Sequence, residues 1–82
     1  MRDDVMKKLS EILVRDFRVS PGAIRDEANF RTHLKLDSLS LVDLVYLVEK
    51  DFGFKATVPE FRDLHTVGAL ANFIVTKLAK TP

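Results

Sequence analysis

Apolar side chains spaced three and four residues apart divide the chain into three amphipathic segments. The first covers residues 3–17, and the second covers residues 39–52, where apolar positions fill nearly half of the helix circumference. The third begins after Thr66, a residue type that commonly caps helix N-termini. The pattern predicts three long helices, with inward-facing residues Val5, Leu9, Ile12, Leu13 and Phe17 in the first, Val42, Val45, Val48 and Phe52 flanked by Leu41, Leu44 and Leu47 in the second, and Val67, Leu70, Ala71, Ile74 and Leu78 in the third.

The segments between these helices carry turn signals instead of a helical period. Residues 18–37 contain the turn sequence Ser20-Pro21-Gly22 and predict a long ordered loop, held to the core by Ile24, Phe30, Leu34 and Leu36. Gly53 stands where a C-cap glycine belongs, and residues 60–64 are long enough for one helical turn.

No segment alternates apolar and polar residues for long enough to predict a strand. We therefore predict an all-α fold, a small four-helix bundle of three main helices and one short helix, with a long loop between the first two helices. One domain is expected over residues 1–82, because a chain of this length builds a single core.

Composition narrows the possible functions. A chain of 82 residues supports a modest core but not a deep, walled active site as well, which argues against most enzymes. The formal net charge of +1 lacks the basic excess of a nucleic-acid binder. The absence of cysteine excludes a disulfide framework and a thiolate metal site, and the absence of a long apolar run argues against membrane insertion. A cytoplasmic protein is the simplest expectation.

The boundary between the long loop and the second helix carries the sequence Leu36-Asp37-Ser38-Leu39. This placement puts the Ser38 hydroxyl in the first turn of an apolar helix, where it should face solvent. Unpaired N–H groups and the helix dipole would stabilise a phosphate attached to Ser38. The alternative is that Asp37 or Ser38 is simply an N-cap residue.

Five matching pieces resemble the acyl carrier protein family over nearly the full chain: Phe30-x-x-x-Leu34, Asp37-Ser38-Leu39, the apolar helix from Val42 through Leu44 and Glu49 to Phe52, Val58-Pro59, and Thr66-Val67. The resemblance implies that Ser38 carries a 4′-phosphopantetheine arm, added from coenzyme A by a Mg²⁺-dependent phosphopantetheinyl transferase. The arm's thiol would hold acyl intermediates of fatty acid, polyketide or related lipid biosynthesis as thioesters. The resemblance also implies a non-catalytic monomer that meets acyl-transferring and ketosynthase-type enzymes.

The residues themselves agree with such a carrier. A chain without cysteine must obtain a reactive sulfur from a prosthetic group. The second helix has more aliphatic side chains than one face of a small bundle needs, and the surplus predicts an apolar cleft for the acyl chain, lined by Leu41, Val42, Leu44, Val45 and Leu64. The alternative for each of these residues is ordinary core packing.

The middle third of the chain is its acidic part, with six acidic and three basic side chains over residues 37–65. This bias predicts docking onto basic patches of partner enzymes, with Asp43 and Glu49 as the candidate contacts. Plain solvation of these two carboxylates is the alternative.

Some residues depart from the family pattern. His33 stands where most members have Asp, Lys35 stands where most have Gly, and the chain is near neutral whereas most members are strongly acidic. These departures favour a specialised pathway over housekeeping fatty acid synthesis. Asp37 favours the acyl branch, because peptidyl carriers usually have Gly before the modified serine.

Other classes fit the residues less well. A hydrolase built from Ser38, Asp37 and either His33 or His65 lacks the G-x-S-x-G elbow, and two distant histidines make no metal site. A DNA-binding helix-turn-helix protein needs a basic recognition helix, yet residues 39–48 contain no positive charge. The stronger alternative is a small helical protein–protein interaction domain with no prosthetic group.

Overall fold

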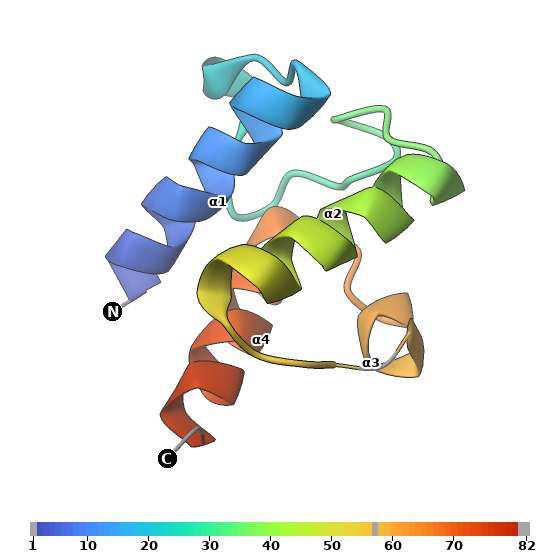
Figure 1. Cartoon of the computed structure of the whole chain (residues 1–82). Helices are drawn as coiled ribbons and strands as arrows, with labels where there is room; N and C mark the ends of the chain where they lie inside the picture. The colour runs from blue at the N-terminus through green and yellow to red at the C-terminus, as the bar shows by residue number, and fades with distance from the viewer. Residues whose placement is uncertain (1, 57, 81–82) are drawn as a thin grey trace.

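The computed structural model describes residues 2–56 and 58–80 and shows a bundle of four α-helices (Figure 1). The helices are α1 (Arg2–Phe17), α2 (Ser38–Phe52), α3 (Val58–Arg62) and α4 (Val67–Lys80), with a short 3₁₀ turn at Pro21–Ala23 in the long loop. Within the described residues, the pairing typical of strands is limited to one isolated bridge between Asn29 and Thr66. The predicted all-α fold of three main helices and one short helix is confirmed. None of the described helices has the length and apolar character needed to cross a bilayer.

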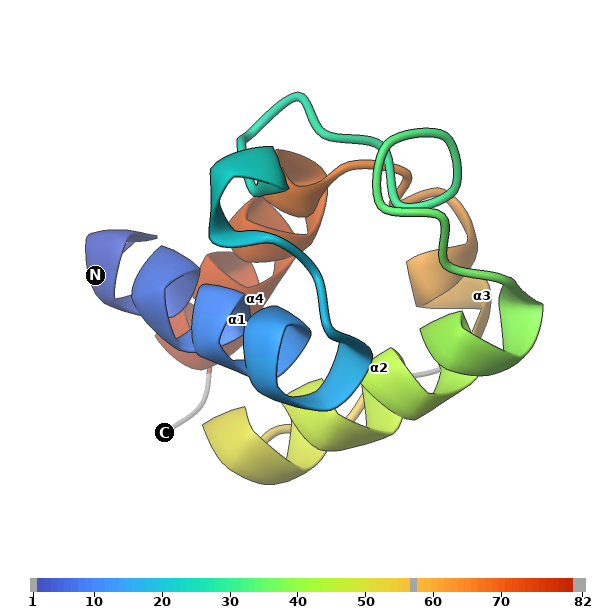
Figure 2. The same ribbon diagram turned by 90° about the horizontal axis from the view of Figure 1, so that it is seen from above.

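The core forms where α1 packs against both α4 and α2 (Figure 2). Leu9, Ile12 and Leu13 of α1 are fully buried, as their spacing predicts. The residues that α4 contributes to the core are also buried, and they are Val67, Leu70, Ala71 and Ile74. The helical periods of these two segments therefore identified the core correctly.

The helix ends follow local capping chemistry. α2 ends at Gly53, whose φ of 77° lies in the left-handed region and whose N–H bonds to the Glu49 carbonyl. α1 ends before Arg18, which takes the same left-handed conformation with a φ of 56°. α3 begins two residues earlier than the predicted 60–64 segment, because proline is well accommodated in the first turn of a helix.

The long loop is fixed to the start of α4. Its predicted anchors Phe30, Leu34 and Leu36 are buried, while Ile24 packs at the edge of the core. Backbone hydrogen bonds join residues 26–30 to residues 65–68, from Phe30 N to His65 O (2.9 Å), from Val67 N to Ala28 O (3.0 Å) and from Gly68 N to Asp26 O (2.9 Å).

Gly68 makes this close approach possible. A Cβ at position 68 would lie 2.8 Å from the Asp26 carbonyl oxygen, which is closer than the two atoms can approach. The long loop and α4 meet at this point because the side chain is absent.

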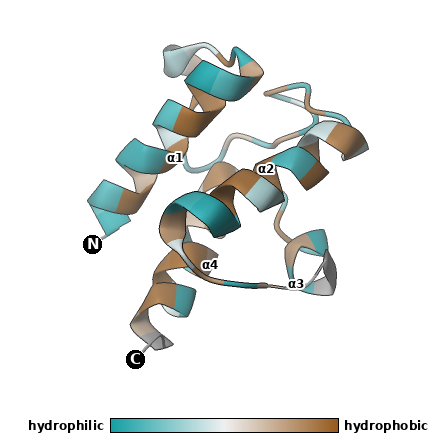
Figure 3. Cartoon of the chain, viewed as in Figure 1, coloured by the Kyte–Doolittle hydropathy of each residue, from teal (hydrophilic) through white to brown (hydrophobic). Residues whose placement is uncertain are grey.

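The second helix differs from its prediction. Its buried residues are Leu44 and Val48, whereas Val42, expected to face inward, is 61% exposed. Leu39 and Tyr46 are exposed as well, and Figure 3 shows hydrophobic colour reaching the N-terminal end of α2. The prediction for Val42 was wrong because the apolar arc is wider than the surface α2 shares with the core, so periodicity alone did not show which part faces inward.

Candidate functional site

Ser38 is the first residue of α2, and its side chain is exposed. The N-cap role belongs to Asp37, whose backbone is extended (φ −87°, ψ −178°) and whose Oδ1 accepts a hydrogen bond from Ser40 N at 2.8 Å. Ser38 is therefore not the capping residue. Its Oγ instead accepts a hydrogen bond of 2.7 Å from Nη2 of Arg31 in the preceding loop.

The carboxylate of Asp37 is ionised beside this hydroxyl. The backbone N–H of Ser40 and then the Ser40 side chain, as hydrogen-bond donors to the carboxylate, lower the pKa of Asp37 from its ordinary value of 3.8. Lys35, two residues earlier, has a φ of 58° in the left-handed region that glycine adopts without strain. The charges next to the Ser38 hydroxyl are thus the Asp37 carboxylate, on the adjacent residue, and the Arg31 guanidinium, which contacts the oxygen.

A cavity of about 550 Å³ opens beside Ser38, between the long loop, α2 and α3. Figures 1 and 2 both place α3 beside the N-terminal half of α2. Among the predicted cleft residues, Leu41, Val42, Val45 and Leu64 line the cavity together with Ser38. Leu44 does not line it, because its side chain is buried in the core with 2% of its surface exposed.

The cavity also contains residues that the sequence did not indicate. Phe30 and Phe61 complete its apolar walls, and Asn29, Arg31, Arg62 and His65 add polar groups to its lining. Phe61 lies on a helix of five residues, which is too short to show a hydrophobic period. Among the described residues that line the cavity none is acidic, and its charged side chains are the cationic Arg31 and Arg62.

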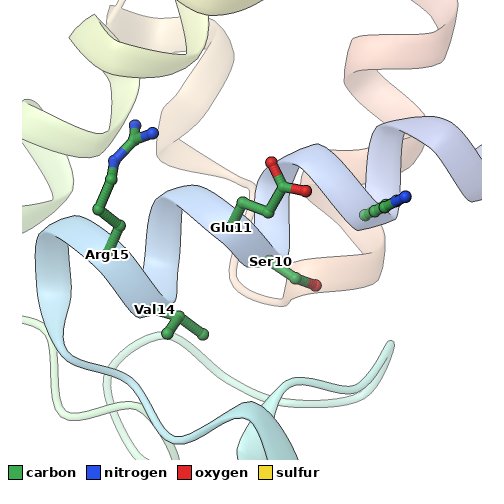
Figure 4. Close-up of a pocket in the computed structure, with 5 residues that line it drawn as sticks. Ser10, Glu11, Val14 and Arg15 are labelled. Carbon is green, nitrogen blue, oxygen red and sulfur yellow. The ribbon is translucent and has the colours of Figure 1, made fainter.

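A second hollow, of about 680 Å³, lies along α1 and is lined by Lys7, Ser10, Glu11, Val14 and Arg15. Figure 4 shows Ser10, Glu11, Val14 and Arg15 all projecting from this one helix. A hollow with a single helix for its wall does not enclose a ligand, and its lining does not include Ser38.

The two candidate docking carboxylates have different surroundings. Asp43 is exposed on α2. Glu49 is half-buried, and its Oε2 accepts a hydrogen bond of 2.8 Å from Ala56 N, so this side chain holds the segment that follows α2. His33 is exposed, and its Nδ1 accepts a hydrogen bond from Asn29 N. Within residues 2–56 and 58–80, no cluster of His, Asp or Glu is arranged to hold a metal ion.

The site fits a phosphopantetheine group. A phosphate ester at Ser38 requires an exposed hydroxyl, and the Ser38 side chain is exposed. A phosphate is stabilised by cationic and N–H donors, which the Arg31 guanidinium and the first turn of α2 supply. An acyl chain requires apolar surface within reach, which the adjoining cavity provides.

Comparison with known proteins agrees with this geometry. The family described as "Phosphopantetheine attachment site" matches residues 7–74. An acyl carrier protein from Thermotoga maritima is 32% identical over 77 residues, covering 94% of this chain and 95% of the relative. One from Rubrobacter xylanophilus is 31% identical over 74 residues, covering 90% and 91%. The solved structure of the acyl carrier protein from Enterococcus faecalis is similar with a TM-score of 0.79 and 27% identity, covering 94% of this chain and 98% of that one.

Proposed function

Because the chain belongs to the acyl carrier protein family, whose members hold a 4′-phosphopantetheine group and are carriers rather than catalysts, we propose that Ser38 bears this group here. The observation that carries the proposal is the exposed Ser38 hydroxyl, at the first residue of α2 and on the rim of an apolar cavity. Asp37 and Leu39 flank the hydroxyl, Asp37 as the helix cap and Leu39 as an exposed apolar contact. We propose that residues 1–82 act as one acyl carrier domain, in agreement with the matched range of 7–74.

In this proposal, the residues of this chain hold the prosthetic group and keep its attachment point accessible to partner enzymes. When bound, the prosthetic group supplies a thiol on a flexible tether, which holds an acyl chain as a thioester. During loading by a phosphopantetheinyl transferase, the Ser38 oxygen would give up its proton and bond to the phosphorus that bears the pantetheine arm of coenzyme A. The pyrophosphate bond of coenzyme A would break, and adenosine 3′,5′-bisphosphate would leave. The rigid cap formed by Asp37 and Ser40 keeps that oxygen at a constant place on the surface.

The cavity is the proposed shelter for part of the acyl chain. Phe30 and Phe61 join the aliphatic side chains predicted for this role, which are Leu41, Val42, Val45 and Leu64. Each methylene that leaves water in this cavity contributes about 0.8 kcal/mol at most. A thioester held partly inside is also less accessible to hydrolysis.

Docking of partner enzymes is proposed on the exposed face of α2. Asp43 lies there with the exposed apolar side chains Leu39, Val42 and Tyr46, which follow one another at helical spacing. Glu49 extends this surface through the part of its carboxylate that Ala56 leaves accessible. The proposed partners are the phosphopantetheinyl transferase and acyl-transferring and ketosynthase-type enzymes, which meet the chain as a cytoplasmic monomer.

The proposed pathway is fatty acid, polyketide or related lipid biosynthesis, in a specialised branch. Support comes from the near-neutral charge and from Lys35, which holds a left-handed conformation at a position where most of the family has glycine. The intact mass of the acylated protein isolated from its own host identifies the cargo. A saturated long-chain acyl group as the sole cargo would contradict the specialised branch.

The attachment is tested by coexpression with a broad-specificity phosphopantetheinyl transferase. We expect one phosphopantetheine mass on the wild-type protein and none on the Ser38→Ala variant. Ser40→Ala is the matched control, because it removes a hydroxyl two residues away in the same helical turn. Loading that survives in Ser38→Ala, or that disappears in Ser40→Ala alone, would contradict the assignment to Ser38.

A further inference from the structure

Arg31 contacts the oxygen of Ser38 and has no carboxylate partner within the part of the chain that the structure describes. Its Nη2 donates to Ser38 Oγ at 2.7 Å, and no ion pair of Arg31 occurs among residues 2–56 and 58–80. A guanidinium has five N–H donors, so one hydrogen bond to a neutral hydroxyl leaves most of its donors and all of its charge available. Arg31 is thus an available cation at the proposed modification site.

The backbone that carries Arg31 is held in place. Asn29 Oδ1 accepts hydrogen bonds from the backbone N–H groups of Arg31 (2.8 Å) and Thr32 (3.1 Å). Phe30, the residue between Asn29 and Arg31, is 3% exposed, and its N–H bonds to the His65 carbonyl. A guanidinium that starts from fixed backbone loses less conformational entropy when it binds than one on a mobile loop.

A phosphate ester on Ser38 changes what Arg31 faces. The ester retains a negative charge and presents anionic oxygens on the phosphorus bonded directly to the atom that Arg31 already contacts. Charge-assisted hydrogen bonds from a guanidinium to phosphate are roughly twice as strong as hydrogen bonds between neutral groups. The preference of Arg31 for the modified form over the bare hydroxyl follows from this difference.

We infer that Arg31 is the counter-ion of the phosphodiester on Ser38 and a positioning residue that keeps the start of the arm beside the cavity. This inference rests on the proposed attachment at Ser38. Arg31 and Ser38 line the same cavity, so an arm held by Arg31 begins on the side where Leu41 and Leu64 offer apolar surface. Among the cavity residues, Arg62 is a second cation but has no hydrogen bond to Ser38.

The test compares apo and holo protein for the wild type and two variants. Arg31→Gln removes the charge, and Arg31→Lys retains it without the planar donor set. Lys35→Gln, in the same loop, and Arg62→Gln, on the same cavity, are controls that remove one positive charge each. Intact mass first shows whether Ser38 is loaded, which tests the proposed function separately from the role of Arg31.

The first readout is the melting temperature of the holo form minus that of the apo form. We expect this difference to be about 2–5 °C larger in the wild type than in Arg31→Gln, with Arg31→Lys in between and both controls similar to the wild type. Raising the salt from about 0.01 M to about 1 M should shrink the gap, because the screening length falls from roughly 30 Å to roughly 3 Å.

The second readout is the ³¹P resonance of the loaded phosphate together with the Arg31 side-chain N–H resonances. We expect the ³¹P resonance to differ between holo wild type and holo Arg31→Gln and to be unchanged by Arg62→Gln, and the Arg31 side-chain N–H resonances to differ between apo and holo wild type. Loaded wild type and loaded Arg31→Gln with equal ³¹P resonances and equal holo-minus-apo differences would overturn the role of Arg31 and leave the attachment at Ser38 intact. Absence of loading at Ser38 in the wild type would overturn the attachment and the inference together.

Discussion

α1 and α2 are nearly equal in length and opposite in how they use their apolar residues. α1 has 16 residues and buries Val5, Leu9, Ile12 and Leu13. α2 has 15 residues, a more apolar composition, and buries Leu44 and Val48. Leu47 and Phe52 pack at the edge of the core, and the remaining apolar side chains of α2 line the cavity or face solvent.

The difference separates two reasons for an apolar residue in a helix. In α1, polar residues occupy most of the outer face, and every apolar residue except the exposed Val14 packs in or against the core. In α2, apolar residues exceed what the core needs, and the excess lies next to Ser38 at the site that partners and cargo are proposed to use. Exposed apolar stretches of this kind are typical of binding surfaces, which supports the proposed use of this one.

The largest expected effect comes from truncating one leucine in each helix. Leu9→Ala in α1 should lower the free energy of unfolding by about 2–5 kcal/mol, because Leu9 is fully buried. Leu39→Ala in α2 should change it by less than about 0.5 kcal/mol, because Leu39 is 78% exposed. Urea unfolding monitored by circular dichroism measures both, and equal losses would contradict the division between the helices.

Two valines of α2 allow the comparison between a buried and an exposed apolar residue to be made within one helix. Val48→Ala should lower the free energy of unfolding by about 1–3 kcal/mol, since its side chain is fully buried. Val42→Ala should leave the free energy of unfolding within about 0.5 kcal/mol of the wild type while weakening protection of a bound acyl chain. The rate of thioester hydrolysis in the acylated protein measures this protection. An unchanged rate would show that Val42 does not help to shelter the acyl chain.

Substitutions just after the C-terminal ends of the two helices should change the free energy of unfolding by smaller amounts, and in opposite directions for α1 and α2. Gly53→Ala should destabilise the protein by about 1 kcal/mol, because a Cβ is strained at a φ of 77°. Arg18→Gly should stabilise it by about 0.5 kcal/mol, since relief of the strain at a φ of 56° exceeds the entropy cost of glycine. Thermal unfolding of the two variants resolves the signs, and a loss of stability in Arg18→Gly would show that its side chain contributes more than its backbone costs.

The smallest expected change in the free energy of unfolding comes from protonation of Asp37 at the N-terminal end of α2. The hydrogen bonds from Ser40 lower the folded-state pKa of Asp37 below 3.8, so the ionised carboxylate stabilises the fold above the unfolded pKa. This contribution should be lost as the pH falls through the lower, folded pKa. Urea unfolding between about pH 6 and about pH 2 measures the loss, and Asp37→Asn, which does not titrate, should show a shallower decline. Identical declines would contradict the role of the carboxylate.

Much of this molecule is predictable because its local signals are strong. The core faces of α1 and α4 follow from their periods, and Asp37 is one of the two residues that capping preferences indicate for the start of α2. The exposure of Val42 does not follow, because a wide apolar arc is compatible with several orientations of α2.

The contact between Arg31 and Ser38 lies beyond sequence reasoning for another reason. It depends on the path of a loop that passes through a left-handed Lys35 and is bonded to the start of α4. The structural role of Glu49 is hidden in the same way, because its partner Ala56 is a backbone donor that no side-chain pattern reveals. Tertiary contacts of loops are the part that the sequence does not specify locally.

The backbone hydrogen bonds between residues 26–30 and 65–68 join the long loop to the segment that leads into α4, and Asn29, Phe30, Arg31 and His65 of the joined segments line one wall of the cavity. α3 also lines the cavity and is attached to α4 by side chains: the Phe61 and Phe73 rings are tilted against each other with centroids 5.1 Å apart, and Glu60 pairs with Lys77 at 2.7 Å. For the proposed acyl cargo, we therefore expect a longer chain to be accommodated when this one five-residue helix is replaced or shifted. The preferred length of the acyl chain would then depend mainly on α3. We expect that grafting α3 from another carrier onto this bundle transfers that carrier's preference and leaves the other helices unchanged.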